Sequence, residues 1–187
     1  MQELTEKLTL YHGSYCEVIT PDLGQCAKYK DFGQGFYLTS SKKQAENFIR
    51  TSVKKAALNG KIDDKQKYGI ISIFQFSYNT GLKIYTFPEA DTNWLHCIVA
   101  HRKKNTFPEL VKEMTEYDII AGKIANDNTN ATIAAYIASA YGQIGTQQAD
   151  NICISLLLPE RLQNQFCFRT NNALKSITFV ESEKIWL

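Results

Sequence analysis

Hydrophobic and polar positions alternate in several short segments of the 187-residue chain, each bounded by glycine, proline, asparagine or aspartate. A period of two, combined with β-branched and aromatic residues, is typical of half-buried strands. The turn at 79–81 separates two of these segments and predicts a hairpin between them. Together the pattern predicts strands over 8–12, 36–39, 69–76, 82–87, 117–121, 165–169 and 176–180.

Helical spacing of apolar residues appears in longer segments. Over 41–58 one face is apolar, Ser40 or Ser41 can cap the start, and Asn59-Gly60 marks the end. The remaining helical patterns predict helices over 88–105, 129–140 and 145–157, and a turn or helical bend over 171–174. The order of elements is neither strict strand-helix alternation nor a helical bundle. We therefore predict the α+β class, in a single domain over residues 1–187.

Composition excludes several classes of protein. Net charge is +2 without a block of like charges, which disfavours a dedicated duplex-binding surface. The five cysteines are odd in number and lack metal-ligand spacing, so we expect free thiols in a reducing cytoplasm and no metal site. No signal segment and no apolar run of about 18 residues is present, so we expect no membrane association.

Two glycine-containing motifs carry candidate chemistry. His12-Gly13 ends the first predicted strand, and Gly33-Gln34-Gly35 leads directly into the strand that bears Phe36 and Tyr37. Glycines two residues apart let backbone groups face a ligand without obstruction by a Cβ atom. Because this motif precedes a strand and not a helix, it does not indicate a Rossmann dehydrogenase. Each motif alone is weak, since a lone histidine or strand tyrosine is more often structural.

In this order and spacing, the two motifs and Asn164-Gln165-Phe166 resemble the ADP-ribosyltransferases of the diphtheria-toxin and poly(ADP-ribose) polymerase type. Nearly the whole chain is similar to a bacterial family of uncharacterised domains grouped with those enzymes. The phrases 30–37, 117–129 and 164–166 carry this similarity. The resemblance implies two small antiparallel sheets that form a cleft with surrounding helices.

The resemblance also implies a site for NAD as substrate, without a metal. Cleavage of the nicotinamide–ribose bond needs an aromatic wall, a donor and acceptor for the carboxamide, a partner for a ribose hydroxyl, and an anion near the developing oxocarbenium ion. Tyr37 and Phe48 can stack on the nicotinamide, backbone Gly13 can bind the carboxamide, and His12 can bind the ribose. The full set of expected NAD-binding residues is His12, Gly13, Ser14, Gly35, Phe36, Tyr37 and Phe48.

The chain departs from the family at the acid, because Gln165 stands where a glutamate is expected. An amide can hydrogen-bond the ribose but cannot supply charge, and losing a charged element costs about 10²–10³ in rate. The expected catalytic residues are therefore Tyr37, Gln165 and Asp127, the last as a substitute carboxylate. The simpler interpretation of Asp127 is a helix cap. Arg102 can hold a phosphate or pair with an acid, although a solvated helix end is the simpler interpretation, and His96 is expected at the surface or in packing.

The leading hypothesis is a cytoplasmic bacterial mono-ADP-ribosyltransferase that modifies a protein, a nucleic acid or a small molecule. The resemblance also implies a role as a toxin or effector and, with it, an antitoxin or immunity-type partner protein. The alternative is a catalytically weakened or inactive module that binds NAD, ADP-ribose or a partner protein on the same fold. RNA 2′-phosphotransferase chemistry on a related scaffold is a third possibility, disfavoured because few basic residues are clearly placed for it.

Overall fold

The computed structural model describes residues 3–125, 127–158 and 162–187, without the side chains of residues 127 and 128. Helices and strands are mixed along the chain, which confirms the α+β class. In chain order the elements are β1 (Thr9–Ser14), η1 (Leu23–Gln25), β2 (Phe36–Leu38), α1 (Lys42–Leu58), β3 (Tyr68–Phe76), β4 (Ile84–Thr86), α2 (Thr92–Arg102), α3 (Pro108–Met114), β5 (Ile119–Lys123), α4 (Asp127–Ile137), α5 (Gln147–Leu157), β6 (Asn164–Phe168), α6 (Asn171–Leu174) and β7 (Ile177–Trp186).

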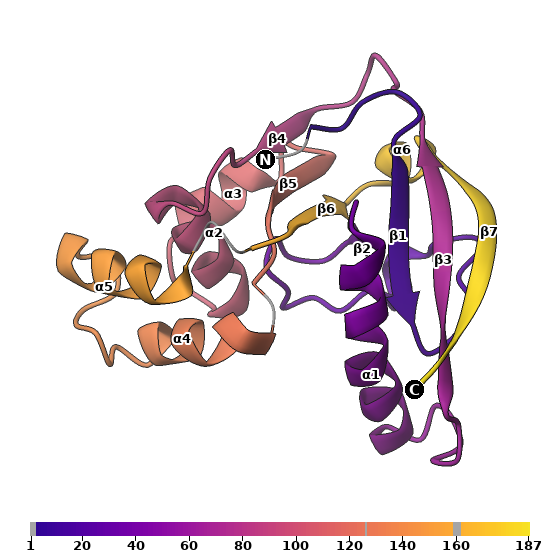
Figure 1. Cartoon of the computed structure of the whole chain (residues 1–187). Helices are drawn as coiled ribbons and strands as arrows, with labels where there is room; N and C mark the ends of the chain where they lie inside the picture. The colour runs from indigo at the N-terminus through magenta and orange to yellow at the C-terminus, as the bar shows by residue number, and fades with distance from the viewer. Residues whose placement is uncertain (1–2, 126, 159–161) are drawn as a thin grey trace.

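The strands form two sheets. The first has the order β1-β3-β7 and is antiparallel throughout, and the second has the order β2-β6-β5-β4. The β2–β6 and β5–β6 pairs are antiparallel, but β4 and β5 run parallel. The expectation of two purely antiparallel sheets is therefore wrong for the second sheet. Figure 1 shows α1 beside the first sheet, with α2 to α5 gathered on the far side of the second.

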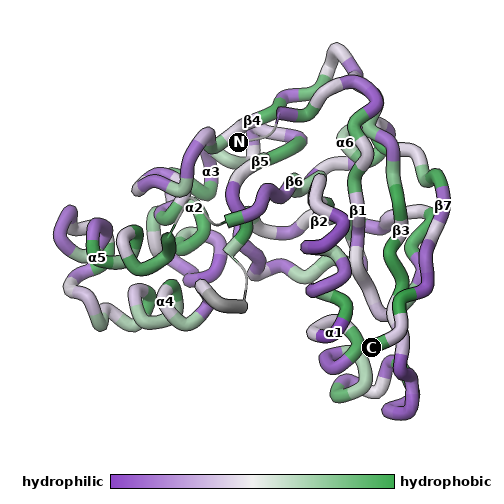
Figure 2. Tube along the Cα trace, viewed as in Figure 1, coloured by the Kyte–Doolittle hydropathy of each residue, from purple (hydrophilic) through white to green (hydrophobic). Residues whose placement is uncertain are grey.

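Three apolar clusters hold these layers together. One lies between the sheets and includes Leu10, Phe36, Phe74 and Phe166. A second joins the apolar face of α1 to the outer face of the first sheet. The third packs α2, α4 and α5 against the other face of the second sheet, around the fully buried Trp94. Figure 2 shows the hydrophobic run along β3, which matches its position as the central strand of its sheet.

The predicted hairpin between residues 69–76 and 82–87 is wrong. A turn does form, because Leu82 N–H donates to Asn79 O at 3.0 Å. However, both edges of β3 are already paired, one with β1 and the other with β7. Since β3 offers no free edge, the chain passes to the second sheet, and β4 pairs there with β5.

Helix boundaries differ from the sequence prediction by a few residues at α4 (127–137 against 129–140) and α5 (147–157 against 145–157), and more clearly at α2 and α3. The helix α2 begins at Thr92, four residues after Pro88, because the Asp91 side chain accepts a hydrogen bond from Trp94 N–H and caps it there. The helix α3 was not predicted separately. It is short and polar, and Met114 is its only fully buried residue among those described, so it lacks a periodic apolar face.

The last strand is longer than predicted. The sequence pattern predicted a strand over 176–180, whereas β7 continues to Trp186 along the full length of β3. Its second half is rich in charged residues, which edge strands tolerate because one side faces solvent. Among the described residues, none of the helices is both long and apolar enough to cross a membrane.

Candidate functional site

Strand register brings the three expected motifs together. Tyr37 of β2 lies opposite Cys167 of β6, and Gly122 of β5 lies opposite Gln165. Residues two apart on a strand share a face, so the side chains of Tyr37 and Gln165 lie on the same face of the second sheet. The strand β1 reaches this sheet through a single bridge between Tyr11 and Thr39. Tyr11, which directly precedes His12-Gly13 in β1, therefore lies beside the end of β2.

The backbone of Gly13 is directed away from β3. Tyr11 N–H donates to Thr39 O at 2.8 Å, and Tyr15 N–H donates to Ser52 Oγ at 3.1 Å, both on the side of β1 opposite β3. Alternate residues of a strand turn their N–H and C=O groups to the same side. Gly13 lies between these two residues, so its N–H and C=O face the same side. Neither group has a hydrogen-bond partner within the described part of the chain.

A side chain at position 13 would not fit. A Cβ atom there would lie 2.1 Å from the carbonyl oxygen of Ala45, where α1 packs on β1. Gly35 is similarly close to β6, since its Cβ would lie 2.5 Å from Cys167 Sγ. Only glycine fits at positions 13 and 35, because α1 lies so close to β1 and β6 lies so close to residue 35. This packing places β1, β2 and α1 around one cleft.

His12 presents one ring nitrogen for binding. Its Nδ1 lies 2.9 Å from the carbonyl oxygen of Tyr37, and because a carbonyl only accepts, Nδ1 carries the proton. Burial lowers the pKa of His12, although the hydrogen bond to Tyr37 partly opposes that shift. The ring is therefore neutral near pH 7, and Nε2 is a hydrogen-bond acceptor. Its ring centroid is 4.5 Å from that of Phe36.

The hydroxyl of Tyr37 is bound to its own loop. It donates to Gly33 O at 2.8 Å and accepts from Phe32 N–H at 2.9 Å. Burial, with smaller contributions from Cys167 and Asp31, raises the pKa of Tyr37 well above its ordinary value. The hydroxyl therefore holds the loop at Phe32 and Gly33 in place through two hydrogen bonds. The part of Tyr37 that remains available to a ligand is its half-buried ring.

Gln165 is bound to a carboxylate that the sequence analysis did not select. Gln165 is 3% exposed, and its Nε2 donates to Asp31 Oδ2 at 2.8 Å and to Lys123 O at 3.2 Å. Asp31 itself is 7% exposed and lies in the loop before β2. An acidic group therefore lies within hydrogen-bond distance of Gln165, the position at which the sequence resemblance led us to expect a glutamate.

Arg102 neutralises this carboxylate. Its Nε and Nη2 donate to Asp31 Oδ1 at 3.0 and 2.5 Å, while Ala125 N–H donates to Asp31 Oδ2 at 3.3 Å. The interpretation of Arg102 as a solvated helix end is therefore wrong. The guanidinium is also held by Asn130, whose Oδ1 accepts from Nη1 at 3.0 Å. Both oxygens of Asp31 are thus engaged by donors, one of which carries a positive charge.

These groups line one cleft with a volume of about 920 Å³. Ser14 and Phe48 line it as well, the former 7% and the latter 40% exposed. All the expected site residues whose side chains the structure describes line the cleft. Asp127 is the first residue of α4, and its side chain lies outside the described part of the structure. Among the described residues that line the cleft, basic side chains outnumber acidic ones. The basic ones are Lys30, Lys55, Lys61 and Arg102, and the acidic ones are Asp22 and Asp31.

Asp31 was missed because its neighbours gave no chemical signal. It directly precedes Phe32-Gly33 in a loop, where an aspartate is ordinarily solvated. Its partners Arg102 and Gln165 are 71 and 134 residues away in sequence. The position of Asp31 next to an aromatic residue, Phe32, does not by itself predict burial, so its burial is decided by the tertiary contacts.

A second polar cluster lies away from the cleft, among α2, α4 and α5. His96 Nε2 lies 2.9 Å from Asp150 Oδ2, and the Tyr136 hydroxyl donates to the other oxygen of Asp150. Asp150 is 4% exposed, and the His96 ring stacks on Phe107 with centroids 4.3 Å apart. His96 is therefore a packing residue, one of the two placements expected for it, and Asp150 does not reach the cleft.

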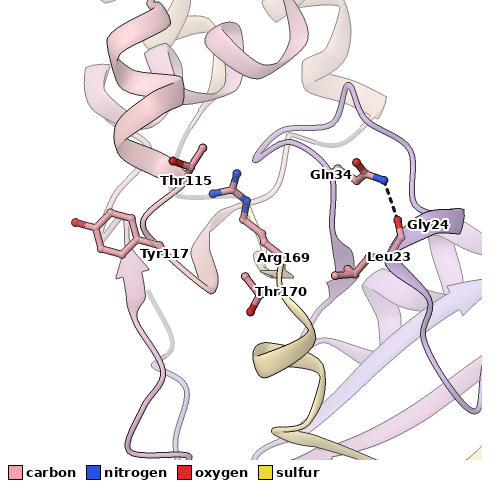
Figure 3. Close-up of a pocket in the computed structure, with 7 residues that line it drawn as sticks. All are labelled: Leu23, Gly24, Gln34, Thr115, Tyr117, Arg169 and Thr170. Carbon is pink, nitrogen blue, oxygen red and sulfur yellow. Dashed lines mark hydrogen bonds between the residues drawn. The ribbon is translucent and has the colours of Figure 1, made fainter.

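The described residues contain no cluster of three or more histidine, cysteine, aspartate or glutamate side chains suited to a metal ion. All five cysteines are free thiols. A smaller pocket of about 380 Å³ lies near the end of β6 and contains none of the expected site residues (Figure 3).

Comparison with known proteins gives one result at the level of families. No curated protein matches the chain. Residues 8–179 match the family described as "Protein of unknown function (DUF3990)". That range includes all of the cleft motifs, from His12 to Gln165, and the smaller pocket. The chain therefore belongs to the DUF3990 family.

Proposed function

We propose that the cleft binds NAD and that the protein is a mono-ADP-ribosyltransferase-like enzyme with an ADP-ribosyltransferase-like fold. The observation that carries this proposal is the convergence of His12, Gly13, Tyr37 and Gln165, from three separate strands, on one cleft. The cleft volume of about 920 Å³ lies toward the upper end of the range for small-molecule sites, about 300–1,000 Å³. A dinucleotide needs a site of that size.

Each part of NAD has a suitable partner in the cleft. The outward N–H and C=O of Gly13 offer the donor and acceptor that a carboxamide requires, and His12 Nε2 can accept from a ribose hydroxyl. The exposed ring of Phe48 and the ring of Tyr37 supply aromatic surface. Lys55 and Lys61 at the rim suit the negative charge of the diphosphate.

Asp31 supplies the negative charge that Gln165 lacks. In the proposed reaction the bond between ribose C1′ and the nicotinamide nitrogen breaks, and its electron pair leaves with neutral nicotinamide. The acceptor then bonds to C1′ and loses a proton. An anion near C1′ stabilises the oxocarbenium ion between these steps. In this proposal Gln165 accepts from a ribose hydroxyl through its amide oxygen, and Asp31 lies directly behind its amide nitrogen.

One observation favours a second candidate function, a module that binds NAD or ADP-ribose without cleaving it. The charge of Asp31 is shared with Arg102, and both of its oxygens already accept hydrogen bonds. A neutralised carboxylate stabilises a developing cation less than a free one. Binding requires none of this charge, so binding and turnover are separable properties of the cleft.

The test measures both properties on one sample. Calorimetry with NAD reports binding, and chromatography of the same mixture reports nicotinamide. We expect NAD to bind, and Phe48→Ala to weaken binding by about tenfold, as expected for a stacking contact worth about 1–1.5 kcal/mol. The matched control is Leu58→Ala on the same helix, because Leu58 is 77% exposed and lies outside the cleft lining.

Catalysis is tested by Asp31→Asn, with Asp64→Asn on the loop after α1 as its control. If Asp31→Asn still binds NAD but no longer releases nicotinamide, the negative charge that stabilises the oxocarbenium ion belongs to Asp31. NAD binding with no nicotinamide from the unmodified protein selects the binding module. Absence of both heat and nicotinamide rejects the NAD site. Circular dichroism of each variant separates loss of function from loss of fold.

The acceptor of ADP-ribose is a protein, a nucleic acid or a small molecule. We further propose a bacterial toxin or effector role, with an antitoxin or immunity-type partner. The cytoplasm suits the five free thiols, because a reducing compartment keeps them reduced. Modification of a bacterial lysate with labelled NAD, followed by protease or nuclease treatment, identifies the class of acceptor.

A further inference from the structure

The smaller pocket is built around Arg169. This residue follows the last residue of β6, and Figure 3 shows its guanidinium directed toward Thr115 across the pocket. The turn after α3 forms one wall, and the loop at Leu23 and Gly24 forms the opposite wall. The volume of about 380 Å³ is near the lower end for ligand sites, so the pocket suits a small molecule.

One edge of the Arg169 guanidinium lacks a partner. Its Nη1 donates to the carbonyl oxygen of Met114, the last residue of α3. Its Nε is buried, and within the described ranges it has no hydrogen-bond partner. Nη2 also has no hydrogen-bond partner there, but unlike Nε it is not buried, and no carboxylate of the described chain forms an ion pair with Arg169. Within the described chain, the Nε–Nη2 edge therefore has no acceptor and the charge has no ion-pair partner, although only Nε is closed off from solvent.

An unpaired buried donor is costly, so its presence points to a missing acceptor. A buried N–H without a partner costs about 1–3 kcal/mol, and more when the group is charged. Asp118, the carboxylate bonded to the neighbouring Thr170, already accepts from Thr170 Oγ1 at 2.5 Å and from Lys83 N–H at 3.0 Å. No acidic residue lines the pocket itself. The lining therefore favours an anion.

We propose that this pocket binds a small ligand through an oxyanion group, a phosphate or a carboxylate, on the Nε–Nη2 edge of Arg169. Two parallel N–H groups on one edge of a guanidinium match two oxygens of either group. The site is distinct from the NAD cleft. The two share no lining residue, and the segment around η1 contributes Leu23 and Gly24 to the pocket but Asp22, Gln25 and Cys26 to the cleft. The proposal does not depend on NAD binding.

The experiment follows the side-chain Nε–H resonance of Arg169 by ¹⁵N NMR. Inorganic phosphate, acetate and sodium chloride are titrated separately at equal ionic strength. We expect a saturable shift with phosphate, acetate or both, and none with chloride. The arm that saturates at lower concentration identifies phosphate or carboxylate as the preferred group. A shift that follows ionic strength in all three arms overturns the proposal.

Two variants test the geometry. Arg169→Lys keeps the charge but removes both the two-pronged donor edge and the Nε–H probe, so binding to this variant is followed through the backbone amide of Thr170, which also lines the pocket. We expect binding to be at least about tenfold weaker, as for loss of one charge-assisted hydrogen bond. The matched control Arg50→Lys lies on an exposed position of α1 and should change nothing. Thr115→Trp fills the pocket and leaves Arg169 in place, so it should abolish the Nε–H shift. Unchanged saturation in Thr115→Trp rejects the site even if Arg169→Lys fails to fold.

Discussion

Gln165→Glu restores the residue type expected at the catalytic position, and the structure predicts that it destabilises the protein. The amide nitrogen of Gln165 donates to Asp31 Oδ2 at 2.8 Å and to Lys123 O at 3.2 Å. A carboxylate in its place turns a donor into an acceptor that faces two other acceptors. The substitution also places two negative charges about 3 Å apart, where both cannot remain ionised.

Proton uptake sets the magnitude of this effect. The introduced carboxyl can take a proton and donate to Asp31 as the amide does. Holding a proton at pH 7 on a group with an ordinary pKa of about 4.3 costs about 3–4 kcal/mol, and about 1 kcal/mol at pH 5. The free energy of unfolding should therefore fall by about 3–4 kcal/mol at pH 7 and recover most of that loss by pH 5.

Urea unfolding at pH 7 and pH 5 measures the change, with Gln163→Glu as the matched control. Gln163 is exposed and two residues upstream, and the same substitution there should change stability by less than about 0.5 kcal/mol. If Gln165→Glu is as stable as the control at both pH values, the contact between Gln165 and Asp31 does not carry the energy assigned to it. Nicotinamide release by Gln165→Glu near pH 5–6 would indicate a transferase pocket that the glutamine had weakened.

Three further predictions concern packing and pH. Gly13→Ala should destabilise the protein by about 1–3 kcal/mol or prevent folding, because its Cβ would lie 2.1 Å from the backbone oxygen of Ala45. Tyr136→Phe should cost about 1–3 kcal/mol, because it removes a donor from the buried carboxylate of Asp150. Burial lowers the pKa of His12, so the unfolded chain binds the proton more readily. Its stabilising contribution is complete above pH 6.5 and decreases as the pH falls below that value.

Each of these predictions has a control and an opposing result. In Gly81→Ala the new methyl group would lie 3.8 Å from Asn79 Oδ1, an ordinary contact, so this variant should cost much less than Gly13→Ala; equal losses would contradict the packing at β1. Tyr78→Phe is the exposed counterpart of Tyr136→Phe, and equal urea midpoints would show that the buried hydroxyl contributes little. For His12, NMR titration gives the pKa directly, and a value at or above 6.5 would show that the ring is not desolvated.

Much of the fold follows from local sequence patterns. Residues 69–76 are apolar and β-branched enough to specify a buried strand, and 41–58 carry a helical apolar face with caps at both ends. Strand pairing does not follow from such patterns. The hairpin prediction failed because β3 already has two partners, one from each end of the chain.

The candidate site shows the same division. Glycine motifs and a strand histidine are local features, and they were sufficient to select residues that meet in one cleft. The charge state of the cleft is not local. It depends on Asp31, Arg102 and Gln165, which are far apart in sequence and reach hydrogen-bond distance only when the loop before β2 packs against the end of α2 and the start of β6.

The sequence by itself therefore determined the α+β class, the main elements and most of the residues that line the candidate cleft at its glycine motifs. The tertiary structure decided which carboxylate lies at the site and what neutralises it. The physical reason is that helix and strand propensities act over a few residues, whereas a buried charge is tolerated only where distant groups supply its hydrogen bonds. Asp31 is buried because Arg102, Ala125 and Gln165 together satisfy it.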